Sequence, residues 1–221
     1  MNQPINKPMR GRGAGQPAWD VALLFPEQGA WSEEEYLDLN SNRLVEFTDG
    51  AIEVLPMPTT SHQLILCYLF RLLEAFVSPR NLGTALLAAL PVQLGPGKYR
   101  EPDIVFMLAQ HAARIGESFW EGADLVMEVV SRNMKDRHRD LVTKRREYAR
   151  AGIAEYWIVD PRQERILVLR LAGTRYVVHG TFSKGSVATS PLLPGFSVDV
   201  TEALSQQVPA AKRSTKRRKE S

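Results

Sequence analysis

The chain has 221 residues, of which 44% are hydrophobic, so it can bury one substantial core but hardly two. Its basic residues outnumber the acidic ones by 28 to 25, yet nine of them lie near the two ends; without these and Glu220, the body keeps 19 basic against 24 acidic residues. A body with a net charge of −5 fits a cation site better than a broad phosphate-binding face.

The single cysteine, Cys67, lies in an apolar segment and excludes an intrachain disulfide, which is typical of a reducing compartment. No apolar run reaches the roughly 18 residues of a membrane span, and the start has no secretory hydrophobic region. We therefore expect a cytoplasmic protein without a membrane segment.

Residues 1–18 are rich in Gly, Pro, Asn and Gln and are predicted to be disordered. Residues 19–207 are expected to form a single domain, and residues 208–221 a basic disordered tail. Within the domain, Ser32 followed by three glutamates is a capping-box pattern, which predicts the start of a short helix.

Two short strands are predicted at residues 44–48 and 51–55, because Asp49-Gly50 between them is a strong signal for a two-residue hairpin turn. Strand alternation places Glu46 on the opposite face from its two apolar neighbours. From the residues alone, Glu46 is more simply a surface carboxylate on an edge strand.

Residues 62–77 are apolar almost all round and predict a helix packed on a sheet, with Ser61 as its N-cap and His62 in its first turn. A histidine in such a place is more often structural than functional. Residues 82–94 are then predicted to form one strand, followed by a Gly-Pro-Gly turn. The other histidines show no metal-ligand spacing, and no Cys/His zinc pattern occurs.

The most informative stretch is residues 101–148. Asp103 opens an apolar strand after Pro102, and residues 124–130 form a second strand that is apolar on both faces except at Glu128. A buried carboxylate costs several kcal/mol unless it is paired, shifted in pKa or bound to a metal. The two acidic side chains are therefore candidates to converge on one site.

A helix predicted over residues 137–151 supplies a cation. Successive residues turn by about 100°, so Leu141, Lys144, Tyr148 and Ala151 share the stripe that faces the sheet. Oxygen ligands with a nearby ammonium suit a divalent ion such as Mg²⁺ and the hydrolysis of a phosphodiester. The alternative is a structural ion pair between the lysine and the strand carboxylate, because such networks also exist without catalysis.

The rest of the chain completes the order of elements. Residues 155–160 are predicted to form the last core strand, whose two aromatic residues pack in the core. A hairpin is predicted at residues 165–171 and 175–179, and residues 192–200 close the ordered body by packing. This order predicts an α/β fold with a mixed β-sheet flanked by helices.

Four fragments occur in a characteristic order: residues 102–105 (PDIV), residues 126–131 (VMEVVS), the spacing Asp140 to Lys144 to Tyr148, and residues 152–160 (GIAEYWIVD). Together they resemble the Uma-two-type putative restriction endonuclease family of the PD-(D/E)xK nuclease superfamily, over about residues 31–204. Two positions depart from the pattern. Val130 stands where the superfamily has its strand lysine, and Arg132 stands where the family usually has proline.

The resemblance implies a restriction-endonuclease-like core and an endonuclease that uses Mg²⁺, or Mn²⁺, to hydrolyse phosphodiester bonds in nucleic acid, most readily DNA. It implies that Asp103 and Glu128 hold the metal, and that Lys144, supplied by the helix, stabilises the charge of the phosphorane or the attacking water. It also makes Glu46 a third metal ligand or water-orienting acid, and brings His62 close to the cleft. A symmetric dimer would suit the cutting of two strands.

Two further residues and two alternatives complete the hypothesis. Asp140 lies one helical turn before Lys144 and is expected to hold its ammonium, whereas Tyr148 is expected to pack beside it. One alternative is a catalytically inactive nuclease-fold protein that binds nucleic acid or a protein partner, because the lysine has left the strand. The other is a structural domain in which Glu128 and Lys144 form an internal ion pair.

The basic tail generates a prediction of its own. Residues 212–219 hold six basic residues, and each phosphate contact that such residues make releases counterions. Deleting residues 208–221 is expected to weaken nucleic-acid binding at moderate salt and to reduce the slope of log affinity against log salt by up to about 5. Fluorescence anisotropy across a salt series measures this slope, and an unchanged slope contradicts a tethering role for the tail.

Overall fold

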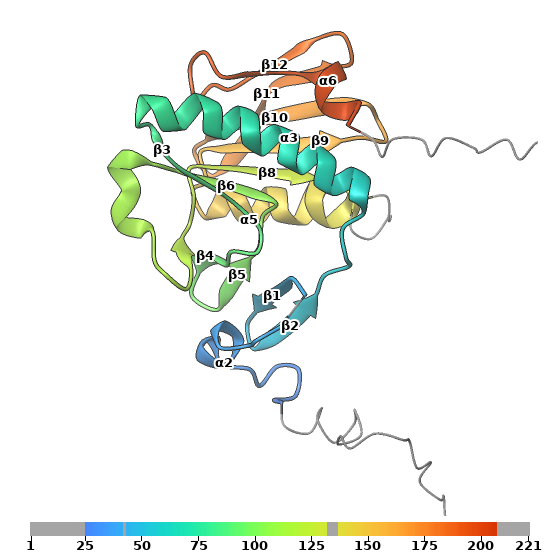
Figure 1. Ribbon diagram of the computed structural model, residues 1–221. Coiled ribbons are helices and arrows are strands. Elements are labelled where there is room, and N and C mark those ends of the chain that lie inside the picture. Colours follow the sequence, from blue (N-terminus) through green and yellow to red (C-terminus); the bar gives the residue numbers. More distant parts are fainter. Residues whose placement is uncertain (1–24, 42, 132–136, 207–221) are drawn as a thin grey trace, which may run out of the picture.

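The computed structural model describes residues 25–41, 43–131 and 137–206. In this part of the chain, strands form two larger sheets and a small two-stranded one, with helices on both sides of the larger sheets (Figure 1). The predictions for residues 1–18, for Arg132 and for the tail at residues 208–221 fall outside the described residues. The predicted α/β fold with a mixed sheet flanked by helices is confirmed.

The larger sheet is mixed, because its central pair of strands runs parallel and the other neighbours run antiparallel. Parallel strands need a crossover connection, and the chain between this pair supplies it as a helix. In spatial order the six strands are β11 (Arg175–Ser183), β10 (Arg165–Ala172), β9 (Glu155–Asp160), β8 (Leu125–Val129), β6 (Ile104–Leu108) and β3 (Gly83–Leu87).

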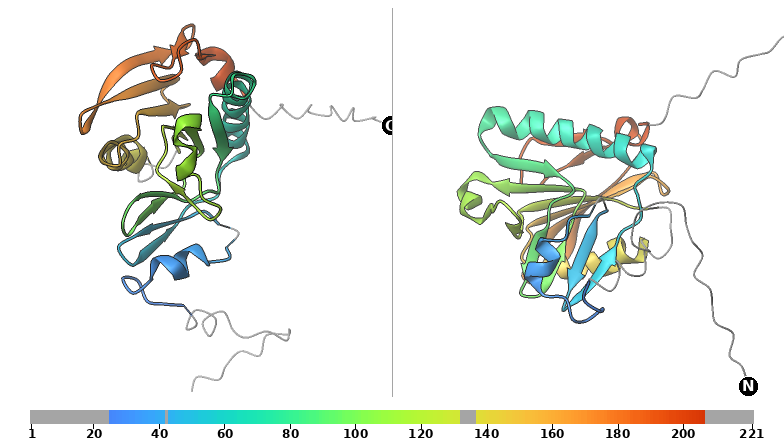
Figure 2. Two further views of the ribbon diagram at one scale, coloured as in Figure 1. Left: turned by 90° about the vertical axis from the view of Figure 1, so that its left-hand side faces the viewer. Right: turned by 60° about the horizontal axis from the view of Figure 1, so that its bottom comes forward.

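Helices cover both faces of this sheet. The faces are covered by α3 (Thr60–Val77) with α6 (Val200–Leu204) on one side and by α5 (Lys144–Arg150) on the other (Figure 2). Alternation along β8 sends Met127 and Val129 into the core under α3, so Glu128 between them faces α5. No helix in the described part of the chain has the length and apolar character needed to cross a bilayer.

The five-stranded sheet packs against helix α2 (Glu33–Leu37), which begins at the capping box predicted at Ser32. Val45 and Phe47 point towards this helix and pack with Tyr36, so Glu46 between them faces away from it. In spatial order its strands are β2 (Ala51–Val54), β1 (Val45–Thr48), β5 (Lys98–Arg100), β4 (Val92–Gly95) and β7 (Trp120–Glu121).

The C-terminal part of the described chain packs on the α3 side, and the packing role predicted for residues 192–200 is seen there. Its short strands β12 (Val187–Thr189) and β13 (Ser197–Asp199) pair antiparallel, and Leu193, Phe196 and Val198 join the core. A buried carboxylate fixes this segment, because Glu155 accepts hydrogen bonds from the backbone N–H of Leu192 and from the Trp157 indole.

Three sequence predictions about elements were wrong. Residues 82–94 do not form one strand, because the chain leaves the larger sheet after β3 and enters the smaller one as β4. An apolar run carries no signal for this change of partner, although Pro91, which has no N–H to donate, lies in the connection. The second strand of the last hairpin, β11, continues to Ser183 instead of ending at residue 179.

The third concerns the cap of α3. The N-cap is Thr59, whose side chain accepts the N–H of His62 at 3.2 Å, and Ser61 is already helical. Thr59 follows Pro58 with the extended backbone (φ −78°, ψ 161°) that an N-cap requires. The helix therefore begins at Thr60, two residues earlier than expected.

The predicted hairpin at Asp49-Gly50 is present, and both turn residues have positive φ. A Cβ at Gly50 would lie 2.5 Å from the Gly29 carbonyl oxygen, whereas one at Gly173, in the β10–β11 turn, would meet nothing within 4 Å. We expect Gly50→Ala to lower the free energy of unfolding by about 2–4 kcal/mol and Gly173→Ala by about 1 kcal/mol. Urea denaturation of both variants measures the difference, and equal losses would show that the close approach to Gly29 is relieved without cost.

Candidate active site

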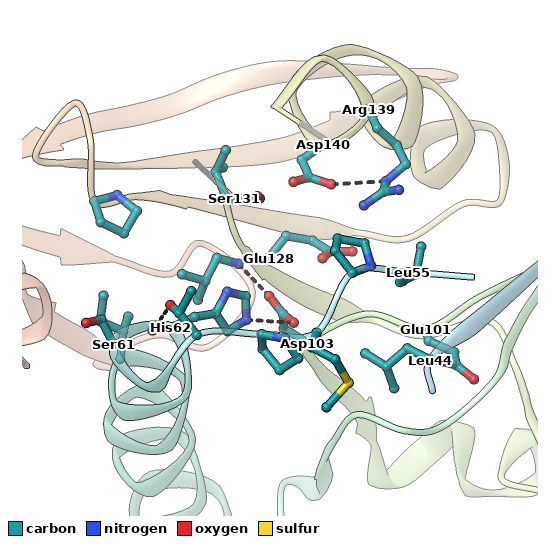
Figure 3. Close-up of a pocket in the computed structure, with 18 of the residues that line it drawn as sticks. Leu44, Leu55, Ser61, His62, Glu101, Asp103, Glu128, Ser131, Arg139 and Asp140 are labelled. Atoms are coloured by element: carbon teal, nitrogen blue, oxygen red, sulfur yellow. Dashed lines mark hydrogen bonds and ion pairs between the residues drawn. The ribbon is translucent and has the colours of Figure 1, made fainter. Parts of the chain in front are cut away.

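A cavity of about 180 Å³ brings together the candidate residues from separate elements (Figure 3). Asp103, Glu128 and Lys144 all line it, together with Glu101 and Asp140. Asp103 precedes β6, Glu128 lies on β8 and Lys144 begins α5. The site is therefore assembled where the two larger sheets meet the N-terminal end of α5.

Glu128 is held by two donors from α5. Its Oε1 accepts hydrogen bonds from Lys144 Nζ at 2.8 Å and from the Tyr148 hydroxyl at 2.7 Å, and the bonds found in the described residues leave Oε2 unused. Burial raises the pKa of Glu128, and the nearby Asp103 and Asp140 charges add to this against the attraction of Lys144. Tyr148, expected only to pack, thus also fixes the orientation of this carboxylate.

Lys144 is 2% exposed and is shared between two carboxylates. Its Nζ lies 2.8 Å from Glu128 Oε1 and 3.0 Å from Glu46 Oε1. Burial alone would lower its pKa, but these carboxylates outweigh burial and raise the pKa well above its usual value. Lys144 therefore carries its charge inside the protein.

Asp140 lies farther from the lysine than predicted, with 4.0 Å between its Oδ1 and Lys144 Nζ. The backbone over Arg139–Thr143 forms a π-helical turn, a wide turn that often occurs at functional sites and that changes the spacing of side chains along the helix. Asp140 Oδ1 is buried and has no hydrogen-bond partner in the described residues, and burial raises the Asp140 pKa to about 6. Its nearest cation in the described part of the chain is Arg139, whose Nε lies 3.7 Å from Oδ1.

Glu46 is buried, so the interpretation as a surface carboxylate on an edge strand is wrong. Its strand lies between β2 and β5, and the residue is 2% exposed. Glu46 Oε2 lies 3.6 Å from Arg100 Nε, and Arg100 in turn makes two hydrogen bonds of 2.9 Å to Glu147 of α5. In the described part of the chain Glu46 contacts Lys144 but is not among the cavity-lining residues.

Asp103 uses both carboxylate oxygens. Its Oδ2 accepts the Val129 N–H at 2.7 Å, which joins the start of β6 to β8, and its Oδ1 lies 3.1 Å from His62 Nε2. Burial lowers the pKa of His62, but the hydrogen bond to Asp103 and the charges of Asp103, Glu128 and Asp140 outweigh it, so the pKa is raised. His62, which sequence reasoning rated as more often structural, therefore contacts the site directly.

Glu101 was missed by the sequence analysis as a candidate. Its Oε2 accepts the Val45 N–H at 3.1 Å, and burial raises its pKa to about 7, with the charge of Glu46 adding to the shift. The signal was present, because Glu101 and Asp103 are two acidic residues in a run of three next to an apolar strand.

The acidic wall fits a small divalent cation. In the described residues, no three His, Cys, Asp or Glu side chains are close enough to hold an ion as they stand. Mg²⁺, however, keeps several waters and is bound by one or two carboxylates together with substrate phosphates. Asp103 and Glu128 supply two such oxygen donors in one cavity. Burial is the main cause that raises the pKa of Glu101, Glu128 and Asp140, and a bound cation would offset the cost of ionising them.

Comparison with known proteins identifies the family. A family model described as "Uma2: putative restriction endonuclease" matches residues 33–201, which is most of the chain. The chain belongs to this family. The resemblance found in the sequence is thereby confirmed. None of the curated proteins matches the chain in sequence.

Solved structures agree on the fold. A protein described as a putative nuclease belonging to DUF820 from Anabaena variabilis superposes with a TM-score of 0.62 at 20% identity, covering 77% of this chain and 97% of the other. The type IIG restriction endonuclease BpuSI gives a TM-score of 0.35 at 16% identity, covering 69% of this chain and 16% of the other, and this weaker likeness carries no argument. The first comparison shows a restriction-endonuclease-like fold.

The raised carboxyl pKa values predict how stability depends on pH. Three carboxyl groups bind protons more tightly in the folded protein than in the unfolded chain: Asp140, Glu101 and Glu128. Their contribution to stability is therefore present below about pH 4, and it is lost as the pH rises through their pKa values in the folded protein. We expect the thermal midpoint without divalent ion to fall between about pH 5 and pH 8. Mg²⁺ is expected to raise the midpoint more at about pH 8 than at about pH 5.5, because the ion displaces these protons.

A matched pair of variants checks this assignment. Asp103→Asn removes a proposed ion-binding carboxylate and is expected to abolish the increment produced by Mg²⁺. Asp124→Asn changes another buried carboxylate, which lies at the other end of β8 and pairs with His111, and is expected to keep the increment. Metal binding at this wall is ruled out if Mg²⁺ still raises the thermal midpoint of Asp103→Asn, or if it raises the midpoint of the wild type equally at both pH values.

Proposed function

We propose that the protein is a Mg²⁺-dependent endonuclease, with Mn²⁺ as an alternative ion, that hydrolyses phosphodiester bonds in DNA. The observation that carries the proposal is that Asp103, Glu128 and Lys144 come from three different elements and line one cavity. Membership of the restriction endonuclease family supplies the reaction class. A cytoplasmic location accords with the lone Cys67, and a symmetric dimer would allow one site to act on each strand.

In this proposal Asp103 and Glu128 hold the ion. When bound, a divalent cation polarises the scissile phosphate and lowers the pKa of the attacking water. The chain's own residues orient the two carboxylates that would hold the ion. Lys144 and Tyr148 fix Glu128 Oε1, while His62 and the Val129 N–H orient Asp103.

Lys144 is assigned to the negative charge that builds up on the phosphate as water attacks phosphorus and the bond to the leaving oxygen breaks. Its charged state, supported by two carboxylates in a buried setting, suits this role. Glu46 contacts Lys144 and lies near Arg100. These contacts favour a role for Glu46 in orienting the lysine over the role of metal ligand that the sequence predicted for Glu46.

Val130, which stands where the superfamily has its strand lysine, is compatible with activity. Val130 is 4% exposed and packs in the core under α5, so a lysine there would have to displace apolar contacts. Lys144 approaches Glu128 from the helix instead, at 2.8 Å. A purely structural ion pair would need neither a cavity nor the pairing of Asp103 with His62 beside it, and these two features favour the enzyme over that alternative.

The decisive test is cleavage of plasmid and single-stranded DNA with Mg²⁺ or Mn²⁺. We expect wild-type protein to cut, and Asp103→Ala and Lys144→Ala each to reduce the rate by about 10²–10³-fold, in line with the loss of one group that stabilises transition-state charge. Lys98→Ala, which removes a half-buried lysine paired with Glu147 outside the cavity, is the matched control and should change the rate little.

Gel-shift binding with the same DNA distinguishes the alternatives. Cleavage that survives both site substitutions would remove these residues from the mechanism. Wild-type protein that binds DNA but cuts none with either ion would support the inactive nuclease-fold protein instead.

A further inference from the structure

The size of the cavity limits which part of a substrate can enter it. Its volume of about 180 Å³ lies below the roughly 300–1,000 Å³ of sites that enclose a whole small molecule. It can take a phosphate and an ion next to the carboxylates, but the flanking nucleosides must remain at its mouth. The residues at the mouth therefore meet the bases on either side of the phosphate.

An apolar arch forms part of this mouth. Pro56, Met57 and Pro58 line the cavity, and we call these three residues the apolar arch. Met57 is 63% exposed, which is the largest fraction among the exposed large hydrophobic residues in the described part of the chain. A side chain that both lines the cavity and faces solvent to this extent lies at its opening.

The arch is anchored at both ends. On one side Leu55 is 7% exposed and donates its N–H to the Leu44 carbonyl at 2.8 Å (Figure 3 shows both residues on one wall). On the other side Thr59 caps α3. The two prolines fix φ and carry no N–H, so the arch presents apolar surface with little conformational freedom. Apolar surface rimmed by polar residues is typical of an interaction site.

We propose that the apolar arch is a wedge that unstacks the base step next to the scissile phosphate, and that the substrate is duplex DNA opened locally at the cleavage step. The inference rests on the proposed function. Proteins that kink DNA insert Met, Pro and other apolar side chains between base pairs at a cost of a few kcal/mol per step. Unstacking at that step lets the backbone turn into a cavity that is too small for stacked nucleosides. Arg139 and Arg162 also line the cavity and belong to the residue type that contacts flanking phosphates.

The test compares two duplexes of the same sequence, one fully paired and one with a mismatch at the mapped cleavage step, because a mismatched step is already partly unstacked. Met57→Ala is expected to slow cleavage of the paired duplex by about tenfold and of the mismatched duplex by less than about twofold. Met57→Leu keeps an apolar side chain of similar size and should retain the wild-type rate on both. Val178→Ala, an exposed valine on β11 outside the cavity lining, is the control and should change neither rate.

A second readout is independent of cleavage. With Ca²⁺ in place of Mg²⁺, 2-aminopurine placed in turn along the paired duplex is expected to brighten on binding wild type or Met57→Leu, and to stay quenched with Met57→Ala. The wedge is overturned if Met57→Ala slows cleavage of both duplexes equally, or if 2-aminopurine does not brighten when wild-type protein binds. If wild type cuts no DNA in any form, the proposed nuclease activity fails, and the fluorescence then decides the wedge alone: brightening that depends on Met57 supports it, and its absence rejects it.

Discussion

One ammonium group shared between two buried carboxylates determines how the functional part of this protein is built. Lys144 Nζ lies 2.8 Å from Glu128 and 3.0 Å from Glu46, and all three residues are almost completely buried. Removing one partner of such a set leaves an uncompensated buried charge, which costs about 3–5 kcal/mol. The contact therefore fixes the relative positions of β1, β8 and α5, because each element carries one of the three groups.

A second buried cation extends the same constraint. Arg100 binds Glu147 of α5 through two hydrogen bonds and also donates to the Phe47 carbonyl and the Thr48 hydroxyl of β1. The five-stranded sheet and α5 are thus joined at two successive turns of the helix, once through Lys144 and once through Glu147. A lysine placed on a helix can be positioned as firmly as one on a strand when the helix is clamped in this way, which gives a physical reason why Val130 need not be lysine.

The cavity gathers acidic and basic groups out of water. Its lining includes four carboxylates, Glu101, Asp103, Glu128 and Asp140, and the basic side chains His62, Arg139, Lys144 and Arg162. Burial is the main cause that raises the pKa of three of these carboxyl groups. A bound cation would offset the cost of ionising such buried carboxylates, and this is the feature that links the cavity to cation chemistry.

The sequence by itself determined the features that depend on near neighbours: the Asp49-Gly50 hairpin, the helix start at Ser32, the order of strands and helices, the family, and the two apolar strands that carry Asp103 and Glu128. Only the tertiary structure decided that residues 82–94 divide between two sheets, that Glu46 is buried, and that Tyr148 bonds to Glu128. Turn, cap and alternation signals act over a few residues, whereas burial and side-chain partners depend on which layers pack together, and that packing joins segments about a hundred residues apart in the chain.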